Sequence, residues 1–255
     1  MPLFFRRQII PFVILFIERD GSTYLTSLLT SHPHIQAVYE RFAVMNQKGA
    51  SAGQQLEWAE SYLTPPLVGP RKAIGFKTKL VDVLDVDGFS AVLKKKGCHI
   101  IQMRRRNFIK AVISRINARR LYESSGNWNL YNESDRMPPM QVDILEFDQF
   151  IKEREDSDRE LQAFASSLQL PKITIEYEDL LKDRDAALGT VFSFLNLRDL
   201  PVESKTLKHT SDDLREAILN FDELRLHYAG TVYASMFDEV LVQGQSEPGR
   251  QRTAV

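Results

Sequence analysis

Residues 9–29 read IIPFVILFIERDGSTYLTSLL, and this stretch decides the fold. The first nine residues are dominated by apolar side chains, which is typical of a strand buried on both faces of a parallel sheet. Gly21 and two hydroxyl residues follow, and a helical pattern then begins. A helix N-terminus leaves backbone N–H groups unpaired and carries a positive partial charge. The stretch therefore predicts a strand, a turn and a helix that together bind an anion.

Buried-strand patterns recur along the chain and alternate with helical patterns. Strands are predicted over 8–17, 73–77, 99–103 and 172–176. Helices are predicted over 22–31, 54–63, 88–96, 108–121, 146–168, 186–195 and 212–227. This alternation predicts an α/β domain with a central parallel sheet flanked by helices on both faces. We expect one domain over residues 1–243 and a disordered C-terminal tail over 244–255.

Composition limits the partners and the compartment. The 33 Lys and Arg residues are balanced by 34 Asp and Glu residues, which argues against electrostatic binding of nucleic acid. Cys98 is the single cysteine, so no internal disulfide forms and a reducing, cytoplasmic setting is expected. The apolar run 9–17 is about half the roughly 20 residues of a transmembrane helix, and it lacks the cleavage site of a signal peptide. No transmembrane segment is expected.

The turn after the first predicted strand carries Arg19, Ser22 and Thr23, which add a positive charge and two hydroxyl donors to the helix N-terminus. A nucleoside triphosphatase would show G-x-x-x-x-G-K-[ST] here, and that spacing is absent. The simpler alternative is that Asp20 or Ser22 only caps the helix.

A second arginine-hydroxyl pair follows the predicted strand at 99–103. Arg106 stands at the strand end and Ser114 follows eight residues later, which places both on roughly one helix face. Because ligands of parallel sheets collect at the carboxyl ends of the strands, this pair and the first turn are expected to hold two phosphates. The alternative is that residues 104–106 form a solvated cluster of arginines.

Together the two turns resemble those of the sulfotransferases that use 3'-phosphoadenosine 5'-phosphosulfate (PAPS), particularly bacterial members that act on carbohydrates or small hydroxylated acceptors. The resemblance implies a P-loop-like fold, PAPS as co-substrate and adenosine 3',5'-bisphosphate (PAP) as product. It implies that the first turn binds the 5'-phosphosulfate and the second binds the 3'-phosphate. The residues concerned are Arg19, Gly21, Ser22, Thr23 and Tyr24 in the first turn, and Arg106 and Ser114 in the second.

The resemblance extends from about residue 13 to residue 241 and implies further site residues. The run HPHIQAVYERF places Glu40 as the catalytic base, and GFKTKL places Lys77 at the sulfuryl group, with Lys79 as its competitor. The run ITIEYEDLLKD places Tyr177 at the nucleotide. The segment KHTSDDLREAILNFDELR resembles the one that closes over the nucleotide, and it suggests two ligands, Lys208 and Ser211. No Cys or His grouping has metal-ligand spacing, so no metal is expected.

Several alternatives stay open at this point. His32 and His34 are possible bases, because some sulfotransferases use histidine. Asp20 stands where the family usually has Ser, and its carboxylate would repel a nearby phosphate. We expect it to point outward and cap the helix through backbone N–H groups instead.

Two rival functions remain, a P-loop-like kinase or nucleotide hydrolase and a non-catalytic nucleotide-binding relative.

Trp128 and Tyr131, in the long polar loop 123–139, are candidates for an acceptor pocket or for loop anchors. The acceptor is expected to be a carbohydrate or another small molecule, and the oligomeric state is open.

Overall fold

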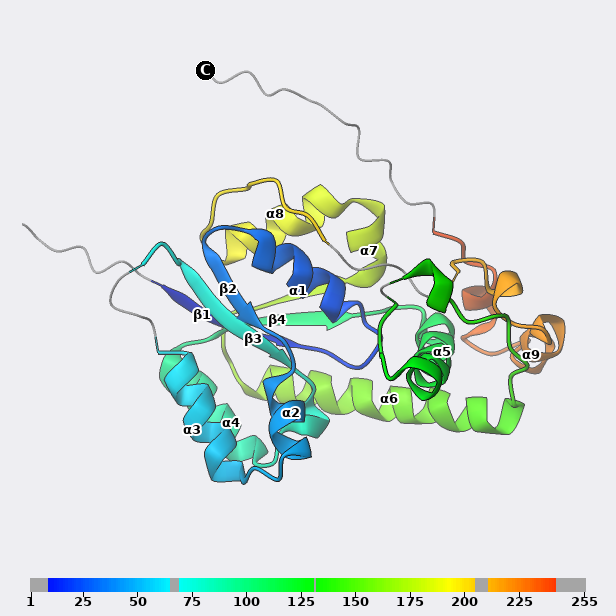
Figure 1. Cartoon of the computed structure of the whole chain (residues 1–255), viewed down its shortest axis with the longest axis horizontal. Helices are drawn as coiled ribbons and strands as arrows, with labels where there is room; N and C mark the ends of the chain where they lie inside the picture. The colour runs from blue at the N-terminus through cyan, green and yellow to red at the C-terminus, as the bar shows by residue number, and fades with distance from the viewer. Residues whose placement is uncertain (1–8, 65–68, 131, 205–210, 242–255) are drawn as a thin grey trace, which may run out of the picture.

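The computed structural model describes residues 9–64, 69–130, 132–204 and 211–241. Its centre is a five-stranded sheet in the order β2-β3-β1-β4-β5, and each pair of neighbouring strands is parallel (Figure 1). The strands are β1 (Ile10–Leu15), β2 (Ile35–Val38), β3 (Ala73–Thr78), β4 (His99–Arg104) and β5 (Lys172–Glu176). Because the strands run the same way, their carboxyl ends meet at one edge of the sheet, where ligands of such folds bind.

Helices cover both faces of this sheet. They are α1 (Ser22–Ser31), α2 (Arg41–Gln47), α3 (Ala52–Tyr62), α4 (Val86–Lys96), α5 (Phe108–Ser125), α6 (Ile144–Ser167), α7 (Tyr177–Lys182), α8 (Arg184–Phe194) and α9 (Phe221–His227). One face packs against α1, α7 and α8, and the other packs against α2, α3, α4 and the C-terminal half of α6. The expected α/β architecture, with a parallel sheet between two helical layers, is confirmed.

The central position of β1 in the sheet explains the apolar run at residues 9–17. Phe12, Ile14 and Phe16 belong to the core on the α1 face, whereas Val13 and Leu15 belong to the core on the α4 face. All five are at most 3% exposed. A strand with helices on both sides has no solvent face, so its sequence carries no polar alternation.

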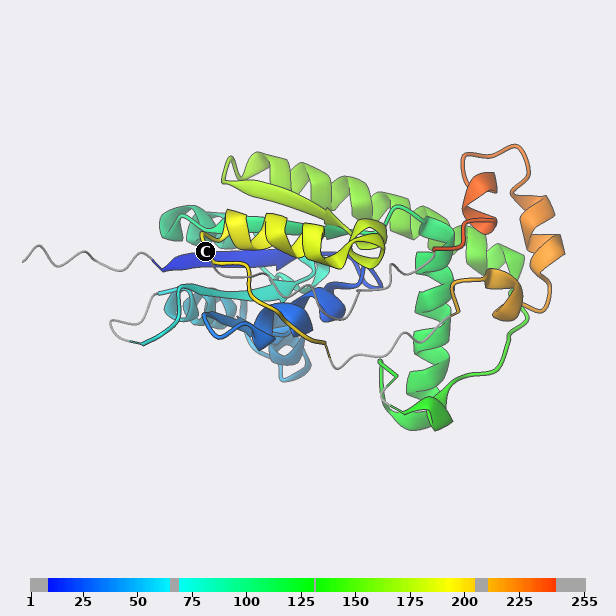
Figure 2. The same cartoon turned by 90° about the horizontal axis from the view of Figure 1, so that it is seen from above.

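A third cluster of buried apolar residues lies beyond the sheet. It joins α5 and the N-terminal half of α6 to the C-terminal segment around α9. Figure 2 shows α5 and α9 standing past the strand ends, at the side of the molecule to which β4 points. The candidate site lies between this cluster and the sheet edge.

The predicted strands and most predicted helices are confirmed, with ends that shift by a few residues. The prediction missed β2, α2 and α7, which are short. The prediction of one helix over 212–227 is wrong, because the chain forms a 3-10 turn at Leu214–Glu216 and then α9. The backbone between these elements pairs with Met140 instead of continuing a helix, and the Asn220 side chain bonds the backbone of Val142.

Within the described ranges, no helix combines the length and the apolar character needed to cross a membrane. The predicted tail at 244–255 lies outside the described residues.

Two glycines give a matched test of the packing. A Cβ at Gly75 of β3 would lie 2.2 Å from the Phe12 carbonyl oxygen, whereas a Cβ at Gly189 of α8 meets nothing within 4 Å. We expect Gly75→Ala to lower the free energy of unfolding by about 1–3 kcal/mol, because the added methyl group overpacks the space beside β1. Gly189→Ala should raise it by about 0.5–1 kcal/mol, because Ala favours the helix. Urea unfolding measures the stability of both variants. An unchanged free energy of unfolding in Gly75→Ala would contradict the close contact between β3 and β1.

Candidate active site

The turn between β1 and α1 contains two residues in the left-handed backbone region. Arg19 has φ 69° and Gly21 has φ 85°. A Cβ on Gly21 would lie 2.3 Å from Cδ2 of Tyr177, so only glycine fits between the turn and that ring. No side chain caps α1 in the described part of the chain, which leaves its first N–H groups available to a ligand. The turn therefore has the form of an anion cradle.

Lys77 of β3 gathers several predicted residues around one buried ammonium. Its side chain is 1% exposed, and Nζ donates to Thr23 Oγ1 at 2.7 Å and to Ser22 Oγ at 3.2 Å. The same nitrogen lies 2.9 Å from Glu40 Oε1. Burial lowers the pKa of Lys77, and the neighbouring Glu40 carboxylate acts in the opposite direction. The structure thus places Glu40, at the start of α2, against the helix N-terminus of the first turn.

Arg19 connects the two predicted turns directly. Its Nε donates to Ser114 Oγ of α5 at 2.9 Å, and its Nη1 donates to the Trp128 carbonyl at 3.3 Å. Burial, together with the charge of Arg105, lowers the pKa of Arg19 to about 10, so the side chain stays cationic at neutral pH. Ser114 therefore lies within reach of the first turn, although it comes from the second motif.

Arg106 makes a different set of contacts. Its guanidinium donates to both carboxylate oxygens of Asp179, at 2.9 and 2.7 Å, and about half of each side chain is exposed. The backbone N–H groups of Arg106 and Asn107 donate to the buried Glu178 carboxylate, each at 3.1 Å. The alternative of a purely solvated arginine cluster does not hold, because the side chains of residues 104–106 have separate partners.

Tyr177 and Arg105 form the floor between the two turns. The Tyr177 ring lies against Gly21, and the Arg105 guanidinium stands 4.8 Å from the ring centroid. Arg105 also donates to the Arg19 carbonyl at 3.3 Å, and burial raises the pKa of Tyr177. Sequence reasoning missed Arg105, although its place at a strand exit was a usable signal. Tyr24 lies on α1 beside this floor, and burial raises its pKa.

The expectation that Asp20 points outward and caps α1 is wrong. Asp20 is fully buried, accepts a hydrogen bond from the Ile17 N–H at 3.0 Å and forms an ion pair with Arg154 of α6. Arg154 also donates to the Glu18 carbonyl at 3.1 Å. Burial raises the pKa of Asp20 to about 6, and Arg154 opposes that shift. The carboxylate at this position is therefore matched by an arginine that the sequence did not indicate.

The remaining candidates lie away from the Lys77 cluster or outside the described residues. His32 is buried against Phe192 and its ring contacts the Arg198 carbonyl, while the His34 ring contacts the Pro70 carbonyl. Neither histidine touches the cluster. Ser211 donates to Glu216, and Lys208 lies outside the described residues, as does Tyr131.

Trp128 stacks on Tyr122 with a centroid distance of 4.4 Å, which fits a loop anchor. In the described ranges, no three His, Cys, Asp or Glu side chains are grouped to hold a metal.

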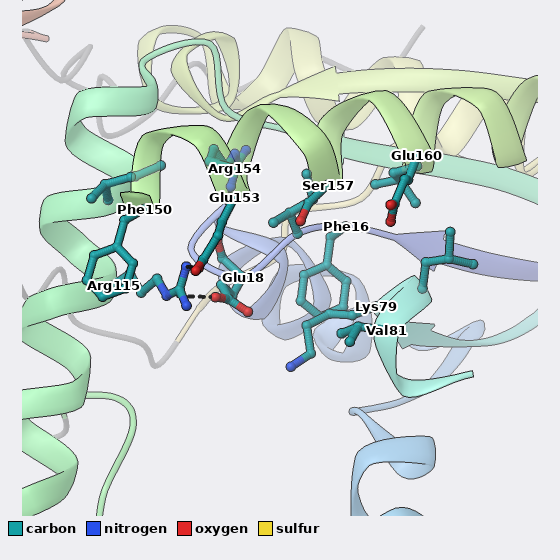
Figure 3. Close-up of a pocket in the computed structure, with 15 residues that line it drawn as sticks. Phe16, Glu18, Lys79, Val81, Arg115, Phe150, Glu153, Arg154, Ser157 and Glu160 are labelled. Carbon is teal, nitrogen blue, oxygen red and sulfur yellow. Dashed lines mark hydrogen bonds and ion pairs between the residues drawn. The ribbon is translucent and has the colours of Figure 1, made fainter. Parts of the chain in front are cut away.

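A pocket opens beside the turn, between the end of β1, α5 and α6 (Figure 3). It encloses about 80 Å³. At one end Arg115 bridges Glu18 and Glu153, at 3.1 and 2.9 Å, and its guanidinium lies 4.4 Å from the Phe150 ring centroid. The other lining side chains named in the figure are Phe16, Lys79, Val81, Arg154, Ser157 and Glu160. Sequence reasoning missed this pocket, because its wall on α6 is distant in sequence from the strand ends.

Lys79 faces this pocket, whereas Lys77 faces the turn. Lys79 Nζ lies 3.6 Å from Asp82 Oδ2. Burial raises the pKa of Asp82, and the charge of Lys79 opposes that shift.

Comparisons with solved structures give weak overall similarity. The mouse sulfotransferase SULT7A1 complexed with PAP aligns with a TM-score of 0.46 and 14% identity, over 75% of this chain and 61% of that one. A sulfotransferase from Alicyclobacillus acidocaldarius aligns with a TM-score of 0.46 and 13% identity, over 92% and 97% of the two chains. No protein-family model matches the chain.

The chain has a parallel sheet, a glycine turn after β1 and an arginine at each of two strand ends, which are the features on which its resemblance to the PAPS-dependent sulfotransferases rests. Its sequence is similar to nodulation protein H of Rhizobium tropici, with 28% identity over 241 residues that cover 89% of this chain and 93% of the relative. Nodulation protein H of Rhizobium meliloti is 27% identical over 243 residues, with 89% and 95% coverage.

The ion pair between Asp20 and Arg154 gives a test of how the turn is supported. Because both side chains are at most 5% exposed, Arg154→Met leaves a buried carboxylate without its cation, and we expect a loss of about 3–5 kcal/mol in the free energy of unfolding. The double variant Asp20→Ser, Arg154→Met should lose much less than the sum of the two single variants. Urea unfolding of the four proteins measures this coupling. Additive losses would show that the pair is not coupled.

Proposed function

We propose that the chain transfers the sulfuryl group of PAPS to a hydroxyl of a carbohydrate or another small-molecule acceptor. The observation that carries the proposal is the cluster around Lys77, where two hydroxyls, a helix N-terminus and a carboxylate meet one buried cation. An activated sulfuryl donor supplies the good leaving group of this reaction, and the protein supplies binding, charge stabilisation and a base.

The first turn fits the phosphosulfate end of the donor. Arg19 and Lys77 carry the positive charge, and the first N–H groups of α1 with Ser22 and Thr23 supply donors. Negative charge grows on the oxygen between sulfur and phosphorus as the bond breaks. Fixed cations in a buried site stabilise this charge more strongly than water does, because they need no reorganisation.

Glu40 is the proposed general base. It lies 2.9 Å from the Lys77 ammonium and about a third of its side chain is exposed, so an acceptor hydroxyl can reach it beside the cation. In this role Glu40 takes the hydroxyl proton while the hydroxyl oxygen attacks sulfur. Lys77 then has two duties, since it holds the carboxylate before reaction and stabilises the leaving oxygen during it.

The second turn is proposed to bind the 3'-phosphate through Arg106 and Ser114. Tyr177 contacts Gly21 and Arg105, and in this proposal it supports the nucleotide between the two turns. Tyr24 of α1 flanks the nucleotide. Lys208 and Ser211 stay proposals as ligands from the C-terminal segment.

The pocket of Figure 3 is the proposed acceptor site. It is bounded by Glu18, the neighbour of Arg19, and by Lys79, two residues after Lys77. Its walls combine the Phe150 ring with carboxylates and cations. Carbohydrates present apolar ring faces and many hydroxyls, so such walls suit them better than a purely apolar alcohol.

The role of Glu40 is tested by Glu40→Gln, which keeps the shape of the side chain and removes its basicity. We expect PAP to bind with nearly unchanged affinity while sulfuryl transfer from labelled PAPS falls by about 10²–10⁴-fold. The matched control is Glu57→Gln, at an exposed residue of α3, and it should transfer the sulfuryl group at the wild-type rate. Full transfer activity in Glu40→Gln would remove this residue from the mechanism. A magnesium requirement would favour a kinase or hydrolase instead.

The acceptor pocket is tested by Phe150→Ala. The assay uses an acceptor that the wild-type protein sulfates, chosen from a panel of carbohydrates and other small hydroxyl compounds. Loss of the ring should raise KM for that acceptor by about two- to tenfold, because it removes a ring face worth about 0.5–1.5 kcal/mol. The affinity for PAP, measured by calorimetry, should not change. An unchanged KM would place the acceptor elsewhere.

A further inference from the structure

Two adjacent carboxylates at the start of α7 contact the second turn in different ways. Glu178 is 2% exposed and accepts hydrogen bonds from the backbone N–H groups of Arg106 and Asn107. It fixes the path of the backbone between β4 and α5. Asp179 is half-exposed, and its carboxylate accepts hydrogen bonds from the Arg106 guanidinium and from no backbone N–H group of the described residues. The backbone of the second turn therefore does not depend on Asp179.

The contact between Arg106 and Asp179 has the geometry of an arginine bound to a phosphate. Two parallel N–H donors meet two oxygens, at 2.9 and 2.7 Å, which is the bidentate arrangement that arginine makes with carboxylates and phosphates alike. Arg106 lowers the pKa of Asp179, so the carboxylate is charged at neutral pH. A 3'-phosphate that uses the same donors must displace this carboxylate or share the guanidinium with it.

The exposure of the pair makes displacement inexpensive. The side chains of Arg106 and Asp179 are 52% and 56% exposed, and exposed ion pairs contribute only about 0–1 kcal/mol. A carboxylate that stays beside a bound phosphate also repels it. Both effects weaken the binding of a nucleotide that carries a 3'-phosphate, and neither acts on a nucleotide without one.

We propose that Asp179 is a specificity-determining residue that competes with the 3'-phosphate for Arg106. It occupies the arginine when the nucleotide is absent, and it lowers the affinity for PAPS and PAP alike. Because product release limits turnover in many enzymes, a competing carboxylate also speeds the departure of PAP. This inference rests on the proposed function, since it requires Arg106 to bind the nucleotide.

The test is calorimetry of the full chain with PAP and with adenosine 5'-monophosphate, which lacks the 3'-phosphate. We expect Asp179→Asn to bind PAP about two- to fivefold more tightly than the wild type and to bind the monophosphate equally well. The matched control is Glu133→Gln, which removes a carboxylate from the exposed ion pair with Arg136 and should change neither affinity. In an Arg106→Gln background, Asp179→Asn should no longer strengthen PAP binding.

Each other outcome has a distinct meaning. Unchanged or weaker PAP binding by Asp179→Asn overturns the inference, because Asp179 would then be inert or would position Arg106. An equal gain for both nucleotides also overturns it, since the effect would not depend on the 3'-phosphate. If the wild type binds no PAP, the proposed function itself fails. Asp179→Ser, with the same expected gain, serves as the second variant if the asparagine protein does not fold.

Discussion

The buried ammonium of Lys77 is the constraint on which the site depends. A lysine at 1% exposure loses its hydration, and it stays charged only if polar groups replace the lost water. Ser22, Thr23 and Glu40 supply those groups, from the start of α1 and the start of α2. One cation on β3 therefore fixes the relative positions of the turn and the carboxylate. Any change that moves β3 against β1 would disturb the anion cradle and the base together.

The acidic residue inside the turn, Asp20, is paired with an arginine from another helix. Asp20 would oppose an anion if it faced the cradle, but Arg154 neutralises it from α6, 134 residues away in the sequence. Arg154 also donates to the Glu18 carbonyl, so it holds the residues on both sides of Arg19. A serine at position 20, as the resembled family usually has, would leave Arg154 buried without its carboxylate. The departure at position 20 and the arginine on α6 therefore form one compensated unit.

The sequence predicted the local features of this site and missed those that depend on distant contacts. The strand, the turn and α1 follow from an apolar run, a glycine and a helical pattern within 21 residues. The meeting of Lys77 with Glu40, the bond between Arg19 and Ser114, and the acceptor pocket depend on how separate elements pack. β2 escaped prediction because it has four residues of mixed exposure, and the predicted C-terminal helix failed because Met140 takes its backbone hydrogen bonds.

The two ends of the proposed nucleotide site differ in how firmly their acidic residues are held. The Asp20–Arg154 pair is desolvated, and separating it would leave two buried charges, so this pair stays closed. The Arg106–Asp179 pair is half-exposed, and water can replace either partner at little cost. The cradle for the phosphosulfate is therefore rigid before binding, as catalysis by fixed charges requires. The opposite end is free to rearrange, so adjustment to the nucleotide falls on the phosphate that takes no part in the reaction.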